Sequence, residues 1–168
     1  LKKKGNPQAA ATLAEKLTEN ILVEMSAVNT NHPVVNAVLN QKFHLAREQG
    51  TSMIFKVGDM SGMRLNEEET VILLSNLLDN AIRECVKVVK AGRKAVIHIK
   101  LVQEDGKIIF SVKNPVVEKV QITDGIVQDS NGGMHGIGLS NVKAVVDKYG
   151  GDFVISCDSE KFQAVVML

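Results

Sequence analysis

Hydrophobic and polar positions follow two different periods along this chain. Steps of three and four residues, typical of amphipathic helices, recur in four stretches, for example at Leu13, Leu17 and Ile21. Alternation with a period of two, typical of half-buried strands, marks five others. We therefore expect helices over 8–28, 34–49, 67–91 and 137–149, and strands over 51–57, 94–103, 107–114, 152–158 and 162–168.

Glycine and proline positions agree with these limits. Pro7 suits the first turn of the first helix, and Gly50 and Gly92 follow the second and third helices, where glycine commonly ends a helix. The Glu104-Asp105-Gly106 segment predicts a hairpin turn between two strands. Residues 115–134 show no period, so we expect a long polar loop there, of a length that is usually functional or disordered.

The connections predict the fold class. Most of the expected strands are joined by a short turn or through one helix, which favours an α+β fold. We expect a two-layer α/β sandwich with one mixed, mostly antiparallel sheet and helices on one face. The helix over 8–28 stands apart, because its single apolar stripe needs a partner, either the body of the domain or another helix.

Composition excludes several classes of protein. The 168 residues, 45% of them apolar, suit one globular domain. Twenty basic residues balance nineteen acidic ones and there is no Trp, so nothing favours a nucleic-acid partner. Cys85 and Cys157 lack metal-type spacing, and we expect both to be reduced core residues. No apolar run approaches the roughly 20 residues that cross a bilayer. Because the chain begins at Leu1, we expect a piece of a longer protein.

Two asparagines mark the polar face of the long helix over 67–91. At 100° per residue, Asn76 and Asn80 lie on one stripe with Arg83 and Lys87, opposite an apolar stripe. Asn is unfavourable within a helix, because its side chain competes for backbone hydrogen bonds. The stripe is either a solvated polar face or a pair of neutral oxygen ligands for a hard cation such as Mg²⁺.

A second candidate site lies where a glycine-rich segment meets a helix. The four glycines Gly132, Gly133, Gly136 and Gly138 precede or open the helix over 137–149. Backbone N–H groups at a helix N-terminus bind anions, and His135 is placed to add a donor. The segment is either a flexible turn or a phosphate site. A phosphate site and a cation face in one domain together favour a nucleoside triphosphate with Mg²⁺.

Both segments resemble a known superfamily. NLLDNAIREC (76–85) resembles the N box of the GHKL ATP-binding domains, and HGIGLSNVKAVVDKYGG (135–151) resembles their second glycine box. The resemblance covers about residues 8–168 and is closest to the sensor histidine kinases of the Agr-like, peptide quorum-sensing type. It implies the Bergerat ATP-binding fold, with ATP and Mg²⁺ held between the sheet, the long helix and a lid over 115–134.

The resemblance also implies roles for particular residues. Asn80 matches the residue that coordinates Mg²⁺, and Asn76 matches the place where hydrolysing members carry a Glu base. Because an Asn amide takes no proton at neutral pH, Asn76 fits a kinase. Asn114 stands about where the family has its adenine-binding Asp, although the first glycine box, Asp-x-Gly-x-Gly, is absent. Alternatively, Asn114 is only a strand-end turn before Pro115. Further nucleotide contacts are implied for Arg83, His135, Gly136, Gly138 and Leu139.

The phosphoacceptor is missing from the sequence. None of the four histidines (His32, His44, His98 and His135) has the sequence context of a phosphoacceptor. The resemblance therefore implies an acceptor His on a helix upstream of residue 1. Residues 1–30 would be the second helix of a dimerisation hairpin, and residues 31–168 the catalytic ATP-binding domain.

We interpret the chain as the catalytic region of a sensor histidine kinase in two-component signalling. Such a protein transfers the γ-phosphoryl group of ATP to a histidine. Its expected partners are ATP, the phosphoacceptor helix, a response regulator and a second copy in the full-length dimer. We expect a cytoplasmic location, attached to a membrane only through an upstream sensor region. The alternatives are another GHKL enzyme, such as an anti-sigma kinase or an ATPase, and a non-catalytic module that holds a partner.

Overall fold

The computed structural model describes residues 28–123, 126–128 and 135–168, so all but the last residue of the expected helix over 8–28 lies outside the described residues. In chain order, the elements are α2 (Pro33–Glu48), β1 (Thr51–Val57), α3 (Glu67–Lys90), β2 (Ala95–Glu104), β3 (Lys107–Pro115), β4 (Gln121–Thr123), β5 (Ile126–Gln128), α4 (His135–Lys148), β6 (Asp152–Cys157) and β7 (Lys161–Met167). These limits lie close to the predicted ones.

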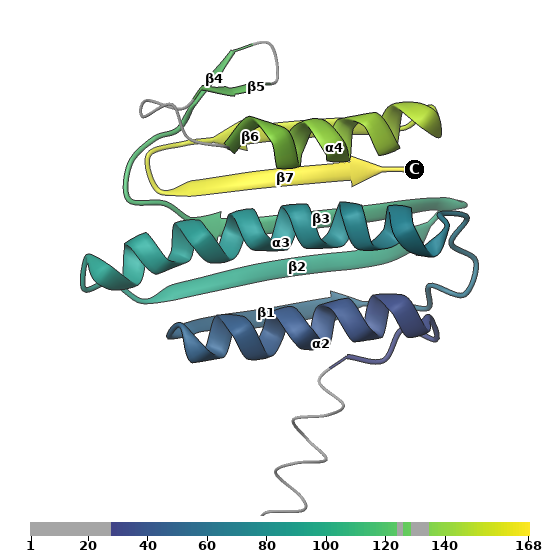
Figure 1. The fold of residues 1–168 in the computed structure, drawn as a ribbon, viewed down its shortest axis with the longest axis horizontal. Helices are drawn as coiled ribbons and strands as arrows, with labels where there is room; N and C mark the ends of the chain where they lie inside the picture. Colours follow the sequence, from purple (N-terminus) through teal and green to yellow (C-terminus); the bar gives the residue numbers. More distant parts are fainter. Residues whose placement is uncertain (1–27, 124–125, 129–134) are drawn as a thin grey trace, which may run out of the picture.

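A five-stranded sheet in the order β1-β2-β3-β7-β6 forms one layer, and α2, α3 and α4 cover one of its faces (Figure 1). β1 and β2 are parallel and are connected through α3, whereas the other neighbouring pairs of this sheet are antiparallel. The predicted two-layer fold with a mixed, mostly antiparallel sheet is confirmed. The core fills the space between the layers, where Leu77, Leu78 and Phe110 are almost fully buried.

The start of α3 is fixed by a capping box. The side-chain oxygen of Asn66 accepts a hydrogen bond from the backbone N–H of Glu69 (2.8 Å), and the Glu69 carboxylate accepts one from the backbone N–H of Asn66 (3.2 Å). The first turn carries three glutamates, residues 67–69, which interact favourably with the positive end of the helix dipole. Gly92 follows the last turn with φ +75°, as its position in the sequence predicts.

The connection over 115–134 differs from the prediction of a wholly irregular loop. Within it, β4 and β5 pair as a short antiparallel hairpin. Three-residue strands are too short to show a period in the sequence, so the pattern gave no signal. The start of the connection is held against the core, because Val116 is buried and its N–H donates to the carbonyl of Glu160 (2.9 Å).

The two cysteines differ in their surroundings. Cys85 is buried in the core as expected, and burial raises the pKa of its thiol to about 12. Cys157 is only partly buried: it packs against the edge of the core, and its sulfur accepts a hydrogen bond from the N–H of Val120 (3.4 Å), so it is less buried than was expected. None of the helices in the described ranges combines the length and hydrophobicity that crossing a membrane requires.

Candidate functional site

Asn76 lies in the seam between α3 and α4. Its amide nitrogen donates to the carbonyl of Ile72 (2.7 Å), and its amide oxygen faces Gly138, where a β-carbon would stand only 2.9 Å away. Asn76 is half-buried rather than fully solvated. The glycine at 138 lets α4 approach α3 closely at this point.

Asn80 follows one turn later on α3, about 6 Å farther along its axis. α4 runs antiparallel to α3, since Lys148 at its end contacts Glu69 in the first turn of α3, and Gly138 near its start meets Asn76. Asn80 is therefore level with the first turn of α4, whose N–H groups have no partners inside the helix. The half-buried Asn80 and the N-terminus of α4 thus lie at the same level of the α3–α4 pair.

Asn114 is the polar exception in the inward-facing stripe of β3. Its neighbours in that stripe, Ile108, Phe110 and Val112, are buried core residues, and Asn114 itself is only 2% exposed. The amide nitrogen donates to the carbonyl of Pro115 (2.9 Å). Its amide oxygen is buried and has no hydrogen-bond partner within the described residues. Because an unpaired buried acceptor is costly, a ligand that brings a donor to this oxygen would be stabilised there.

Asn114, Asn80 and the start of α4 lie at one end of the molecule. β3 runs antiparallel to β2, which follows the C-terminal end of α3, so the end of β3 lies at the same side as the C-terminal half of α3. The start of α4 lies there too, because α3 and α4 are antiparallel (Figure 1). The fold therefore brings together three sequence segments that the family resemblance assigned to one nucleotide site.

The remaining predicted site residues have different surroundings. Arg83 is exposed on α3, one turn beyond Asn80. Leu139 is buried in the core, so its main role in the structure is packing. α4 begins at His135, two residues earlier than predicted, so His135 and Gly136 belong to the first helical turn rather than to a preceding loop. The side chain of His135 lies outside the described part of the chain.

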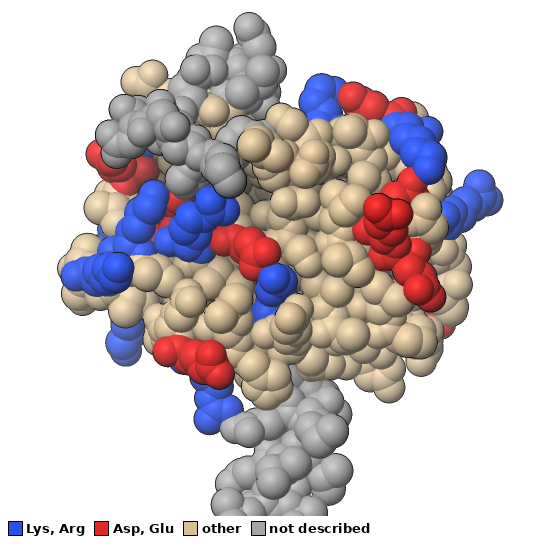
Figure 2. Space-filling view, viewed as in Figure 1, with Lys and Arg blue, Asp and Glu red and all other residues tan. Residues whose placement is uncertain are grey.

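Positive charge gathers beside this site. In Figure 2, Lys and Arg side chains cluster at the left, where Figure 1 places the C-terminal half of α3. The exposed basic residues of that half of α3 are Arg83, Lys87 and Lys90, of which Lys87 is paired with Glu84 (2.7 Å). Such a cluster raises the local concentration of anions, which suits a site for a phosphorylated ligand.

Sequence reasoning missed two residues that support the site. Glu69 connects α3 to the end of α4, and Arg93 donates from its guanidinium to the carbonyl of Val116 (3.2 Å), which holds the start of the β3–α4 connection. The spacing of Asn66 and Glu69 is a recognisable capping signal. The contacts of Glu69 with α4 and of Arg93 with residue 116 depend on tertiary structure and left no signal in the sequence.

Comparison with known proteins identifies the class. Residues 65–168 match the family described as the GHKL domain, and the chain belongs to this family, whose members bind ATP. The predicted GHKL membership is thus confirmed. The Agr-like subtype remains a prediction. Among curated protein sequences, none matches the chain significantly.

Solved structures with a similar fold include the catalytic domain of the histidine kinase ThkA, with 16% identity, a TM-score of 0.62 and coverage of 83% of this chain and 93% of that one. The histidine kinase AdeS of Acinetobacter baumannii is 18% identical, with a TM-score of 0.57 and coverage of 96% of this chain and 78% of that chain. Full-length ShkA in complex with AMPPNP is 16% identical, with a TM-score of 0.59, and covers 99% of this chain and 39% of that one. At these identities the likeness establishes the fold alone.

Proposed function

We propose that this chain is the ATP-binding catalytic region of a sensor histidine kinase. The observation that carries the proposal is the buried oxygen of Asn114, which has no hydrogen-bond partner among the described residues and lies at the same end of the fold as Asn80 and the start of α4. Together these groups offer an acceptor for an adenine amino group, an oxygen ligand for a cation and backbone donors for phosphates. ShkA, which shares the fold, was solved with AMPPNP, an ATP analogue.

Each residue has a distinct task in this proposal. Asn114 accepts the hydrogen bond of the adenine amine, and the first turn of α4 binds phosphate oxygens through its N–H groups. Asn80 offers its amide oxygen to a Mg²⁺ ion, which adds positive charge at the phosphates when it is bound. Such catalysis consists of positioning and charge stabilisation. A ring nitrogen of the acceptor histidine takes the γ-phosphoryl group, and ADP is the leaving group.

The surroundings of Asn76 favour a kinase over an ATPase. An ATPase needs a base that takes a proton from water, and an amide cannot do so at neutral pH. In addition, the Asn76 amide nitrogen is engaged by Ile72 and its oxygen is pressed against Gly138. A site with no base at this position protects ATP from water until an acceptor arrives.

The acceptor and the remaining partners are part of the same proposal. We expect the phosphoacceptor His on a dimerisation helix upstream of residue 1, a response regulator as the next acceptor, and a membrane-attached, Agr-like full-length protein. The competing proposal, a non-catalytic binding module, is supported by the absence of the Asp-x-Gly-x-Gly box after β3.

Two measurements test the proposal. Calorimetric titration with ATP should show Mg²⁺-dependent binding and a preference for ATP over GTP. Incubation with labelled ATP should leave this chain unlabelled, yet transfer acid-labile phosphate to a separate polypeptide that carries the upstream helix. No binding at millimolar ATP excludes the kinase and leaves the binding module. Binding without transfer to that polypeptide argues against the histidine acceptor.

A further inference from the structure

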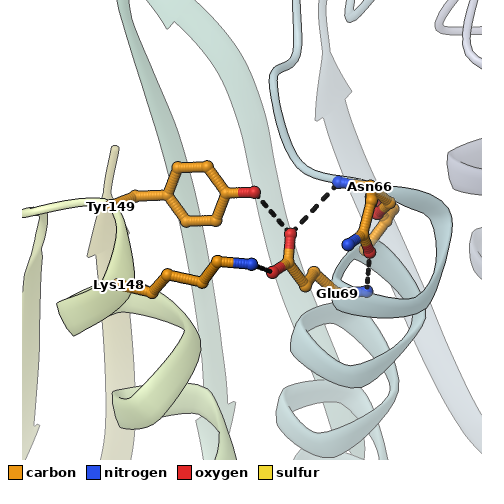
Figure 3. Close-up of polar contacts among 5 residues, drawn as sticks. Asn66, Glu69, Lys148 and Tyr149 are labelled. Atoms are coloured by element: carbon orange, nitrogen blue, oxygen red, sulfur yellow. Dashed lines mark hydrogen bonds and ion pairs between the residues drawn. The ribbon is translucent and has the colours of Figure 1, made fainter.

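The carboxylate of Glu69, in the first turn of α3, is bound by the end of α4 (Figure 3). It accepts hydrogen bonds from the ammonium of Lys148, from the hydroxyl of Tyr149 (2.5 Å) and from the backbone N–H of Asn66 (3.2 Å). Figure 3 shows the side chains of Lys148, the last residue of α4, and of Tyr149, which follows it, reaching across to the same carboxylate. We call Glu69, Lys148 and Tyr149 the α3–α4 clamp.

The clamp stays formed over the whole pH range near neutrality. The hydrogen bonds from Lys148 and Tyr149 lower the pKa of Glu69 to about 2, and they raise the pKa values of Lys148 and Tyr149. The carboxylate is therefore ionised, and both donors keep their protons, at any pH at which a kinase works. The clamp therefore joins the two helices at all of these pH values and does not respond to pH near neutrality.

The clamp and the Asn76–Gly138 contact hold α4 at two separated points. Ten residues separate Gly138 from Lys148, which corresponds to about 15 Å along the axis of α4. A helix that is fixed at two points this far apart has a set direction as well as a set position. The location of its first turn, level with Asn80, then depends on the contact made at its far end.

We propose that Glu69 is a positioning residue for nucleotide binding. By holding the end of α4 on the first turn of α3, it sets where the N–H groups at the start of α4 stand relative to Asn80. This inference rests on the proposed ATP site and assigns it a support at the opposite end of α4.

The chain offers matched variants. Glu69→Gln removes the charge but keeps a side-chain acceptor for the N–H of Asn66, so the capping box survives. Lys148→Met removes the partner from the α4 side without touching that box. Lys143→Met is the control, because Lys143 pairs with Asp147 on the exposed side of the same helix and does not reach α3. Val38→Ala, on the buried face of α2, lowers stability without touching the clamp.

The experiment measures calorimetric Mg·ATP affinity, thermal stability and phosphotransfer kinetics for these variants. Glu69→Gln and Lys148→Met should each weaken Mg·ATP affinity roughly three- to tenfold. The double variant should bind Mg·ATP no more weakly than the single ones, since both single variants remove the same Glu69–Lys148 ion pair. In phosphotransfer, KM for ATP should rise while kcat stays unchanged. Lys143→Met and Val38→Ala should bind like the parent at temperatures where they are folded.

Three results overturn the inference. The first is parental affinity in Glu69→Gln. The second is found by comparing Val38→Ala with a clamp variant whose melting temperature falls by the same amount. If both lose the same affinity for Mg·ATP, the clamp acts only through stability. The third is a parent that binds no nucleotide, which overturns the proposed function as well. The first two leave the ATP site intact, so the two proposals fail in distinguishable ways.

Discussion

Gly138 lies against the side chain of Asn76, so that a β-carbon at Gly138 would stand 2.9 Å from the amide oxygen of Asn76. The amide is held in place by the hydrogen bond from its nitrogen to the carbonyl of Ile72 (2.7 Å). The second glycine of the glycine box therefore has a packing role that is separate from any contact with phosphate. It allows α3 and α4 to approach each other closely at this point.

Gly138→Ala should destabilise the domain, although Ala is a better helix former than Gly by about 1 kcal/mol. Overlap with Asn76 forces either a helix shift or loss of the Ile72 hydrogen bond, at a cost of about 1–3 kcal/mol. Urea unfolding of Gly138→Ala, Asn76→Ala and the double variant gives the coupling between the positions. The double variant should be less destabilised than the sum of the single ones. If Gly138→Ala alone is stabilising, the close contact does not limit the packing of α4.

Asn80→Ala should remove the coupling between Mg²⁺ and nucleotide. Losing an oxygen ligand to a bound ion costs on the order of a charged hydrogen bond, about 1.5–3 kcal/mol, which is tenfold or more in affinity. Affinity for ATP without Mg²⁺ should change much less. Titration of ATP with and without Mg²⁺ measures the difference, and Gln41→Ala on the exposed side of α2 is a control for amide loss. Parental Mg²⁺ dependence in Asn80→Ala would mean that the stripe is only a solvated face.

The sequence predicted the elements well where the pattern was long, and less well where structure depends on distant contacts. The 24 residues of α3 carry a strong period and both end signals, so its limits were predicted closely. The β4–β5 hairpin, with strands of three residues each, was too short to be seen. The burial of Asn114 was not predictable from its own neighbours, because Pro115 next to it equally suits an exposed turn. Its burial follows from the register of β3 between β2 and β7.

Asn114→Leu should change nucleotide binding without lowering the stability of the domain. The buried oxygen of Asn114 lacks a partner in the described part of the chain, so an apolar side chain of similar size removes a desolvation cost of about 1–3 kcal/mol. We expect unchanged or higher resistance to urea together with loss of the preference for ATP over GTP. Unfolding midpoints and competitive titration with the two nucleotides test both parts. A variant that is less stable yet still prefers ATP would refute the assignment.

Glu69 should contribute to the loss of unfolding free energy at acid pH. Hydrogen bonds from Lys148 and Tyr149 lower its pKa from 4.5 to about 2. A depressed folded-state pKa gives stability that is fully present above 4.5 and is lost as pH falls toward 2. The difference in unfolding free energy between the parent and Glu69→Gln should therefore be constant above about pH 5 and should shrink below pH 4.5.

The comparison with Glu69→Gln is needed because other carboxylates act in the same range. The pKa of Asp59 is lowered by hydrogen bonds from Ser61, and that of Asp158 by the N–H groups of Glu160 and Lys161. Both carboxylates are present in the parent and in Glu69→Gln, so their contributions cancel in the difference in unfolding free energy. Urea unfolding between pH 3 and pH 6 is the measurement. A difference that is independent of pH across this range would show that Glu69 is not held ionised by the clamp.

Lys42 and Asp79 form an ion pair (2.7 Å) between α2 and α3, and the two ends of the pair differ in burial. The Lys42 side chain is 11% exposed, whereas that of Asp79 is 44% exposed. Removing each partner should therefore have a different cost.

Asp79→Asn leaves a buried ammonium without its counter-charge, which we expect to destabilise the domain by about 1–3 kcal/mol. Lys42→Met keeps the apolar stem and leaves a carboxylate that water already reaches, so its cost should stay below about 1 kcal/mol. The double variant should resemble Lys42→Met, because once the ammonium is gone the charge of Asp79 has nothing to offset. Urea unfolding of the three variants distinguishes this order from equal single costs, which would mean that the pair contributes through its geometry and not through the burial of Lys42.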